Sequence, residues 1–253
     1  MVAEELFVNE PVRRRLAIAL DLGDLAEAAA LARVVRPYFG VAKIGLELYS
    51  AAGPRALAAL ADEGFDILCD LKLHDIPNTV GRAARQLGRL SPSCLLTVHT
   101  AGGAEMLRVA VEGFAEGAGA GAGGILGVTV LTSDAEAPAE TLQERAALAR
   151  DAGCAGVVCA ADDLPVVVPV VSGLVRAVPG IRPTGTDAGD QKRTATPAAA
   201  VAAGASLLVV GRAVTGAADV AKAAAGVAAE AAAAFREALD GNTHDNIKDA
   251  LRW

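Results

Sequence analysis

Three charged side chains interrupt an apolar, strand-like segment in the first third of the chain. Asp70, Lys72 and Asp75 lie within FDILCDLKLHDIPNTV, which begins at Phe65. Charge on a buried strand is costly unless it is paired, and such pairs often mark functional sites. Because side chains alternate along a strand, Asp70 and Lys72 share one face. The spacing predicts a carboxylate beside a fixed ammonium, which can stabilise a developing negative charge.

The residues after this strand predict a turn that opens a helix. Pro77 is tolerated in a first helical turn, and the helix is expected over 77–90. Asp75 then lies on a loop above the carboxyl end of the strand. A structural ion pair at a strand terminus is the alternative interpretation of Asp70 and Lys72, since ion-pair networks also perturb titration.

Eight short apolar runs alternate with helical segments and predict the elements that position these charges. The runs cover 16–21, 41–48, the strand that holds Asp70 and Lys72, 94–99, 124–131, 155–160, 173–178 and 206–211, and the last helix is expected over about 217–239. Runs without polar alternation indicate parallel strands covered by helices, which favours a (β/α)8 TIM barrel over a doubly wound sheet. We expect one barrel domain over 1–240 and a polar tail over 241–253.

Charged residues recur at the carboxyl ends of the predicted strands, where barrel active sites lie. Asp21, Lys43, Asp70 and Lys72 all occupy such positions. His99 also ends a strand, but imidazole is readily accommodated beside backbone carbonyls, so we leave it outside the catalytic set. Independent features of the sequence therefore converge on one rim.

Composition excludes several classes of function. The 253 residues carry 23 Lys plus Arg against 30 Asp plus Glu, a formal charge of −7, and only 3% are aromatic. Neither a general nucleic-acid-binding face nor a base-stacking surface is expected. The N-terminus lacks a signal-peptide core, and no apolar run reaches the ~18 residues of a membrane span. Four cysteines without CxxC spacing suggest buried, reduced thiols in a cytoplasmic protein that binds no metal.

Two glycine-rich regions have different interpretations. Gly119, Gly121 and Gly124 satisfy G-x-G-x-x-G, but they follow a helix and open a strand, the reverse of a dinucleotide-binding turn. The segment 178–197, VPGIRPTGTDAGDQKRTATP, is long for a connection and follows the seventh strand, whereas Gly211 and Arg212 follow the eighth. Barrels often bind phosphate at these two loops, so we expect a phosphate site there.

The motif DLKLHDIPNTV resembles the signature of the orotidine 5'-phosphate decarboxylases. ALD at 19–21 and GRAVT at 211–215 agree with it, so that the resemblance spans nearly the whole chain. Ala160 in VCAA and Ala213 in GRAVT depart from VCSA and GRPIT, which are common in the family. Neither departure replaces a charged residue of the expected site.

The resemblance implies a role for each matched position. Asp70 and Lys72 match the catalytic pair, Lys43 joins their charged array, and Asp75 matches an aspartate that enters the active site of the partner subunit. The implied substrate-binding residues are Asp21, Lys43, Ile76, Thr79, Thr132, Arg182, Gln191, Gly211 and Arg212. Ile76 and Thr79 would accompany Asp75 across a homodimer interface.

The activity that the resemblance implies is decarboxylation of orotidine 5'-phosphate to uridine 5'-phosphate and carbon dioxide, without a cofactor. Lys72 would stabilise and then protonate a carbanion at C6 of the pyrimidine. The alternatives are a metal-dependent phosphosugar decarboxylase or aldolase on the same barrel, and a non-catalytic nucleotide-binding barrel. IPNT and GDQKR count against the first of these, and the intact charged array counts against the second.

Overall fold

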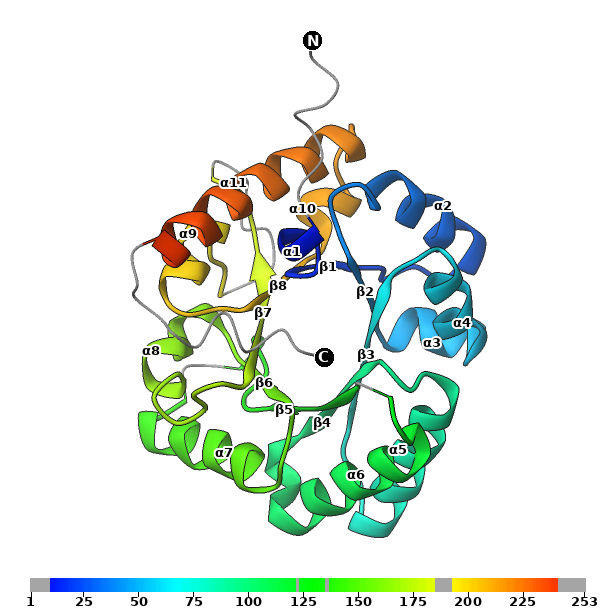
Figure 1. The fold of residues 1–253 in the computed structure, drawn as a ribbon, viewed down its shortest axis with the longest axis vertical. Coiled ribbons are helices and arrows are strands. Elements are labelled where there is room, and N and C mark those ends of the chain that lie inside the picture. The colour runs from blue at the N-terminus through cyan, green and yellow to red at the C-terminus, as the bar shows by residue number, and fades with distance from the viewer. Residues whose placement is uncertain (1–9, 122, 135–136, 185–192, 241–253) are drawn as a thin grey trace.

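The protein, described here from a computed structural model, is a closed barrel of parallel strands in the order β1 to β8. The structure describes residues 10–121, 123–134, 137–184 and 193–240. Viewed down the barrel, the strands form an inner ring and the helices surround it (Figure 1). The predicted (β/α)8 architecture is confirmed, while Gln191 and the tail over 241–253 lie outside the described residues.

The strands of the barrel are short, and helices connect them. The strands are β1 (Leu16–Ala19), β2 (Val41–Ile44), β3 (Asp66–Leu73), β4 (Leu95–His99), β5 (Gly124–Val128), β6 (Gly156–Val158), β7 (Val175–Ile181) and β8 (Leu207–Val210). The helices include α1 (Glu10–Arg13), α2 (Leu25–Val35), α3 (Leu46–Ala52), α4 (Arg55–Asp62), α5 (Pro77–Leu90), α6 (Gly103–Ala118), α7 (Ala139–Asp151), α8 (Leu164–Val167), α9 (Pro197–Ala202), α10 (Arg212–Thr215) and α11 (Val220–Asp240). Short 3-10 turns, η1 (Thr100–Gly102) and η2 (Ala161–Asp163), follow β4 and β6.

Alternation along each strand divides the core into two layers. Outward side chains pack beneath the helices, and a smaller inward cluster fills the barrel. The inward cluster is Ala17, Ala19, Val41, Leu68, Leu95, Leu126, Val175, Ala177, Leu207 and Val209. Lys43, Asp70 and Thr97 each follow a member of this cluster by two positions. Because side chains alternate along a strand, these polar groups also face inward, at the carboxyl end of the barrel.

Several expected element boundaries were wrong, and two of them have identifiable reasons. The second strand ends at Ile44 rather than at residue 48, because Gly45 caps a helix that begins at Leu46. The seventh strand continues to Ile181, with a register shift between Val178 and Ile181. Within this shift Gly180 has φ +78, and an irregular pairing suits Pro179, which has no N–H to donate.

Helix α5 begins at Pro77 and ends at Leu90, as the sequence predicts, and it packs directly on α6. Glycines bring the two helices into backbone contact. A Cβ at Gly113 would lie 2.2 Å from the carbonyl oxygen of Gly81, and one at Gly117 would lie 2.1 Å from that of Arg85. This close contact fixes the start of α5, and therefore the loop that carries Asp75.

The cysteines are free and buried, as expected. Burial raises the pKa of Cys94, Cys154 and Cys159 to about 12. Of the helices in the described ranges, none combines the length and apolar character needed to cross a membrane.

Candidate active site

Three charged side chains from β2 and β3 form a continuous array at the carboxyl end of the barrel. Lys72 Nζ lies 2.8 Å from Asp70 Oδ2, and Lys43 Nζ lies 3.7 Å from the same oxygen. Lys43 Nζ also donates to Asp21 Oδ1 at 2.8 Å. The predicted pairing of Asp70 with Lys72 is confirmed, and the array extends to the two upstream residues that the sequence singled out.

A bulge in β3 sets the geometry of this array. Cys69 pairs with Leu96 of β4 and Leu73 pairs with Val98, so three residues of β3 lie opposite the single residue Thr97. The segment thus holds two extra residues. Because the number is even, the alternation of faces survives, and the strand's apolar side chains on both sides of the bulge still face the helices.

Lys72 occupies an unusual backbone conformation within the bulge. Its φ is +50, which makes it the only described non-glycine residue with a positive φ. For a residue with a Cβ this region costs about 1–2 kcal/mol. Strain of this kind persists only where the surroundings enforce it.

Thr97 forms hydrogen bonds with both Lys72 and Asp70. The Lys72 backbone N–H donates to Thr97 Oγ1 at 2.8 Å, and the Thr97 hydroxyl donates to Asp70 Oδ1 at 3.0 Å. Asp70 therefore accepts from Thr97 on one oxygen and faces two ammonium groups on the other. Thr97 itself is fully buried.

The electrostatics of the site keep the central carboxyl ionised. Burial of Asp70 by itself raises its pKa, but the charges of Lys72 and Lys43 and hydrogen bonds from Lys72 and Thr97 outweigh that effect. The pKa of Asp70 consequently lies below its ordinary value. An ionised Asp70 holds the Lys72 ammonium at the edge of the barrel interior.

A cavity of about 90 Å³ opens beside the array. Lys43, Asp70, Lys72 and Thr97 form one side of it. The rest of the lining is mainly apolar: Leu68, Val128, Val130, Leu131, Thr132, Val158, Ala177, Pro179 and Val209. Thr132, predicted to contact the pyrimidine, is thus brought to the same cavity as the charged residues.

Gly45 allows Asp21 and Lys43 to meet. A Cβ at Gly45 would lie 2.7 Å from Asp21 Oδ1 and 2.9 Å from Lys43 Nζ. Any larger residue would displace this ion pair. The Asp21 side chain remains 54% exposed, so its second oxygen can reach a ligand from outside the barrel.

Asp75 and its neighbours take no part in the array of their own chain. The Ile76 N–H donates to Asp75 Oδ1 at 2.6 Å, and none of the ion pairs among the described residues joins Asp75 to Lys43 or Lys72. Asp75 and Thr79 are exposed, and Ile76 is 65% exposed. Within one chain these residues are not part of the cavity.

The residues expected to hold phosphate follow β7 and β8. Arg182 comes directly after β7, and its backbone N–H donates to the Ala195 carbonyl at 2.9 Å, which joins the two ends of the long loop. Gly211 follows β8, and Arg212 opens α10 with an exposed side chain. These three lie at the same end of the barrel as the array, although none lines the cavity described above. Gln191 is outside the described residues.

His99 ends β4 as predicted, near the array but outside its ion pairs. Its ring centroid lies 5.4 Å from that of His74. Burial, together with His74, Lys72 and Arg145, lowers the pKa of His99, against an opposing effect of Asp134. Among the described residues no three His, Cys, Asp or Glu side chains form a group that could hold a metal ion.

The sequence analysis missed Gly45, Thr97 and Pro179. Thr97 carried a usable signal, because it is the polar residue inside the apolar run LLTVH. Gly45 and Pro179 carried none beyond their place near strand ends. Their contributions depend on contacts between strands, which the order of residues does not reveal.

Comparison with known proteins identifies relatives across most of the chain. Residues 14–227 match the model of the orotidine 5'-phosphate decarboxylase / HUMPS family. Orotidine 5'-phosphate decarboxylase of Anaeromyxobacter sp. (strain K) is 47% identical over 85% of this chain and 97% of its own length. The enzyme of that name from Halorhodospira halophila is 45% identical over 90% and 100%. A crystal structure of orotidine 5'-phosphate decarboxylase from Lactobacillus acidophilus superposes with a TM-score of 0.72 at 32% identity, covering 86% of this chain and 99% of that one.

Proposed function

The chain belongs to the orotidine 5'-phosphate decarboxylase / HUMPS family, and on that premise we propose that it converts orotidine 5'-phosphate to uridine 5'-phosphate and carbon dioxide in pyrimidine nucleotide synthesis. The observation that carries the proposal is the array of Lys43, Asp70 and Lys72 on the wall of a small apolar cavity. No cofactor is required for the steps that follow.

Lys72 supplies the chemistry at the reacting carbon. When the bond between C6 and the carboxylate carbon breaks, the electron pair stays on C6, where no adjacent carbonyl can delocalise it. A cation fixed at that point before reaction stabilises the transition state more than the ground state. The Lys72 ammonium then transfers a proton to C6, and the amine regains a proton from water.

Asp70 positions Lys72 and repels the substrate carboxylate that leaves as carbon dioxide. Its low pKa keeps it ionised, so it holds the Lys72 ammonium at 2.8 Å. A substrate carboxylate placed near Lys72 also lies near Asp70, and like charges raise the energy of the bound substrate. Loss of carbon dioxide relieves that repulsion.

The remaining predicted residues bind the parts of the substrate that do not react. Asp21 and Lys43 contact the ribose, Thr132 contacts the pyrimidine, and Arg182, Gln191, Gly211 and Arg212 hold the phosphate. A guanidinium can bind phosphate through two parallel hydrogen bonds. Binding energy from the phosphate can then be used at the distant reacting carbon.

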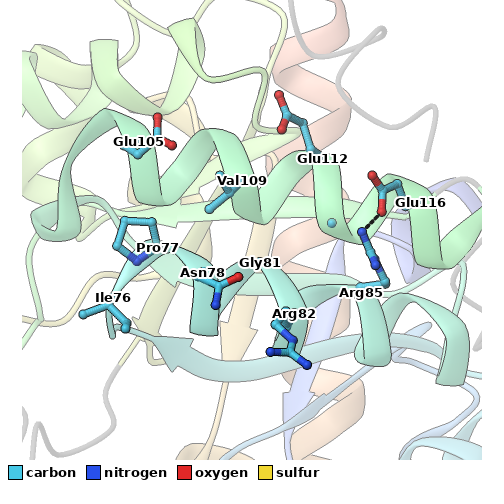
Figure 2. A pocket seen from close by; sticks show the side chains of 11 residues that line it. Ile76, Pro77, Asn78, Gly81, Arg82, Arg85, Glu105, Val109, Glu112 and Glu116 are labelled. Carbon is cyan, nitrogen blue, oxygen red and sulfur yellow. Dashed lines mark hydrogen bonds and ion pairs between the residues drawn. The ribbon is translucent and has the colours of Figure 1, made fainter.

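We further propose a homodimer in which Asp75, Ile76 and Thr79 enter the site of the partner subunit. The exposed Ile76 lines a groove of about 540 Å³ between α5 and α6 (Figure 2). Arginines of α5 and glutamates of α6 line the groove, and the Arg85–Glu116 pair spans it. A face that carries both signs of charge beside an exposed apolar side chain suits contact with a second copy of itself.

The central experiment follows the absorbance of orotidine 5'-phosphate after addition of the purified protein and a chelator. We expect the absorbance to fall, and loss of the reaction in the presence of the chelator would favour the metal-dependent phosphosugar alternative. Tight binding of uridine 5'-phosphate without release of carbon dioxide would favour a non-catalytic barrel.

Replacement of the proposed proton donor gives the sharpest test. Lys72→Ala is expected to lower kcat by about 10³-fold or more, because both charge stabilisation and proton transfer are lost. Lys222→Ala, which removes an exposed lysine on α11, is the matched control and should leave kcat unchanged. Circular dichroism and binding of uridine 5'-phosphate check that the variant is folded. Near-normal turnover by Lys72→Ala would refute the assignment.

A further inference from the structure

The bulge in β3 leaves the backbone of Lys72 with an unusual hydrogen-bond partner. In a regular ladder, a strand N–H bonds to a backbone carbonyl of the neighbouring strand. Here the Lys72 N–H bonds instead to the side-chain oxygen of Thr97, the one β4 residue opposite the three bulged residues. A side chain thus replaces the backbone at the point where Lys72 has φ +50.

The same hydroxyl completes a closed ring of interactions. The Lys72 N–H donates to Thr97 Oγ1, the Thr97 hydroxyl donates to Asp70 Oδ1, and the Lys72 ammonium donates to Asp70 Oδ2. The direction of each bond is fixed, because an ionised carboxylate can only accept and an amide N–H can only donate. Thr97 is the sole member of the ring that carries no charge.

We infer that Thr97 is a positioning residue for decarboxylation, holding both the left-handed backbone of Lys72 and the Asp70 carboxylate, so that the ammonium points into the cavity. The inference rests on the proposed function, in which Lys72 is the proton donor. Thr97 lines the cavity but carries no group that transfers a proton to C6. It acts on the reaction only through its two neighbours.

A positioning role predicts a particular kinetic pattern. Thr97→Val keeps the shape of the side chain and removes the hydroxyl, so the ring opens at two bonds. The ammonium is then less well aimed in the transition state, while distant contacts to phosphate and ribose remain. We expect kcat to fall about 30-fold or more with KM within about threefold of the unaltered enzyme.

Two companion variants separate positioning from a loss of packing. Thr97→Ser retains the hydroxyl and should keep kcat within about threefold. Thr100→Val is the matched control, because Thr100 is equally buried and donates its hydroxyl to the Val128 carbonyl, outside the ring. It should lose stability without loss of kcat.

The outcomes distinguish this inference from the proposed function. An inactive Lys72→Ala enzyme together with a fully active Thr97→Val enzyme overturns the positioning role and leaves the proposed function standing. An active Lys72→Ala enzyme overturns the role of Lys72 on which this inference rests, and an unaltered protein that does not convert orotidine 5'-phosphate overturns the proposed function itself. If Thr97→Val does not fold, Thr97→Ser decides the matter: a kcat below about a tenth of the unaltered value contradicts a role that depends on the hydroxyl.

Discussion

Asp70 is the residue on which the charged array depends. Its carboxylate lies between two ammonium groups, Lys72 at 2.8 Å and Lys43 at 3.7 Å, and Thr97 holds its other oxygen. Removal of the central negative charge would leave two cations facing each other in a mainly apolar wall. A buried pair that loses one partner is destabilised far more than an exposed pair.

This arrangement predicts how stability changes with pH. The folded pKa of Asp70 lies below its ordinary value of about 3.8. Between the two values the unfolded chain binds the proton more readily, so the stabilisation is fully present above pH ~4 and is lost as pH falls through the folded pKa. We expect Asp70→Asn to lower the free energy of unfolding by about 3 kcal/mol at pH 6.

Urea unfolding at values from about pH 2.5 to about pH 6, a range that spans the carboxyl titration, measures this difference. The difference in the free energy of unfolding between the unaltered protein and Asp70→Asn should become smaller as the pH is lowered. Asp62→Asn, at an exposed position of α4, is the control and should stay within about 0.5 kcal/mol throughout. A difference in the free energy of unfolding that does not change with pH would contradict the electrostatic account.

At the scale of elements, the contact between α5 and α6 positions the loop that begins the predicted interface. The helices meet through glycines, and their backbones approach too closely for a Cβ at Gly113 or Gly117. The loop with Asp75 and Ile76 immediately precedes α5. A shift of α5 would therefore move the residues proposed to reach the partner subunit.

Addition of a single methyl group at Gly113 tests the contact between α5 and α6. Gly113→Ala is expected to lower the free energy of unfolding by about 2 kcal/mol, because the new Cβ would lie 2.2 Å from the Gly81 carbonyl oxygen. Gly226→Ala on α11 has open space around its Cβ and should stabilise the protein by about 0.5–1 kcal/mol. Thermal and urea unfolding of both variants measure the difference; equal effects would show that helix propensity, not the contact, governs Gly113.

The sequence predicted those features that a single strand or helix determines. The order of strands and helices, the start of α5 at Pro77 and the pairing of Asp70 with Lys72 follow from local pattern and alternation. The bulge opposite Thr97 could not be predicted, because it arises from the register between β3 and β4. The extension of β7 through Pro179 depends in the same way on its pairing with β8.

At the scale of the whole molecule, one chain holds an incomplete version of the proposed site. Asp75 is exposed and forms no ion pair with Lys43 or Lys72 among the described residues, and the proposed homodimer would bring the Asp75 of a second copy beside Lys72. A symmetric dimer would complete two such sites, each built from both chains.

Mixing of inactive variants tests this shared construction. In a heterodimer of Lys72→Ala and Asp75→Ala chains, one of the two sites carries both altered residues and the other carries neither. Half of randomly mixed dimers are heterodimers, so we expect recovery of about a quarter of the unaltered activity. Activity is measured after the two chains are dissociated, mixed and reassociated.

The control pairs Lys72→Ala with Asp70→Ala. Both residues belong to the same side of the site, so every site in that heterodimer lacks one of them and no recovery is expected. Absence of recovery with Asp75→Ala, in heterodimers verified by mass, would show that Asp75 does not act across the interface.

The β3 bulge contains an even number of extra residues. It therefore changes the inward face, which carries Asp70 and Lys72, without changing which side chains pack under the helices. Leu71 and Leu73 pack against the outer core as regular strand residues would, although the chain between Cys69 and Leu73 is longer than its partner on β4. An insertion of two residues therefore adds groups to the inner face of the barrel while the outer face stays packed against the helices.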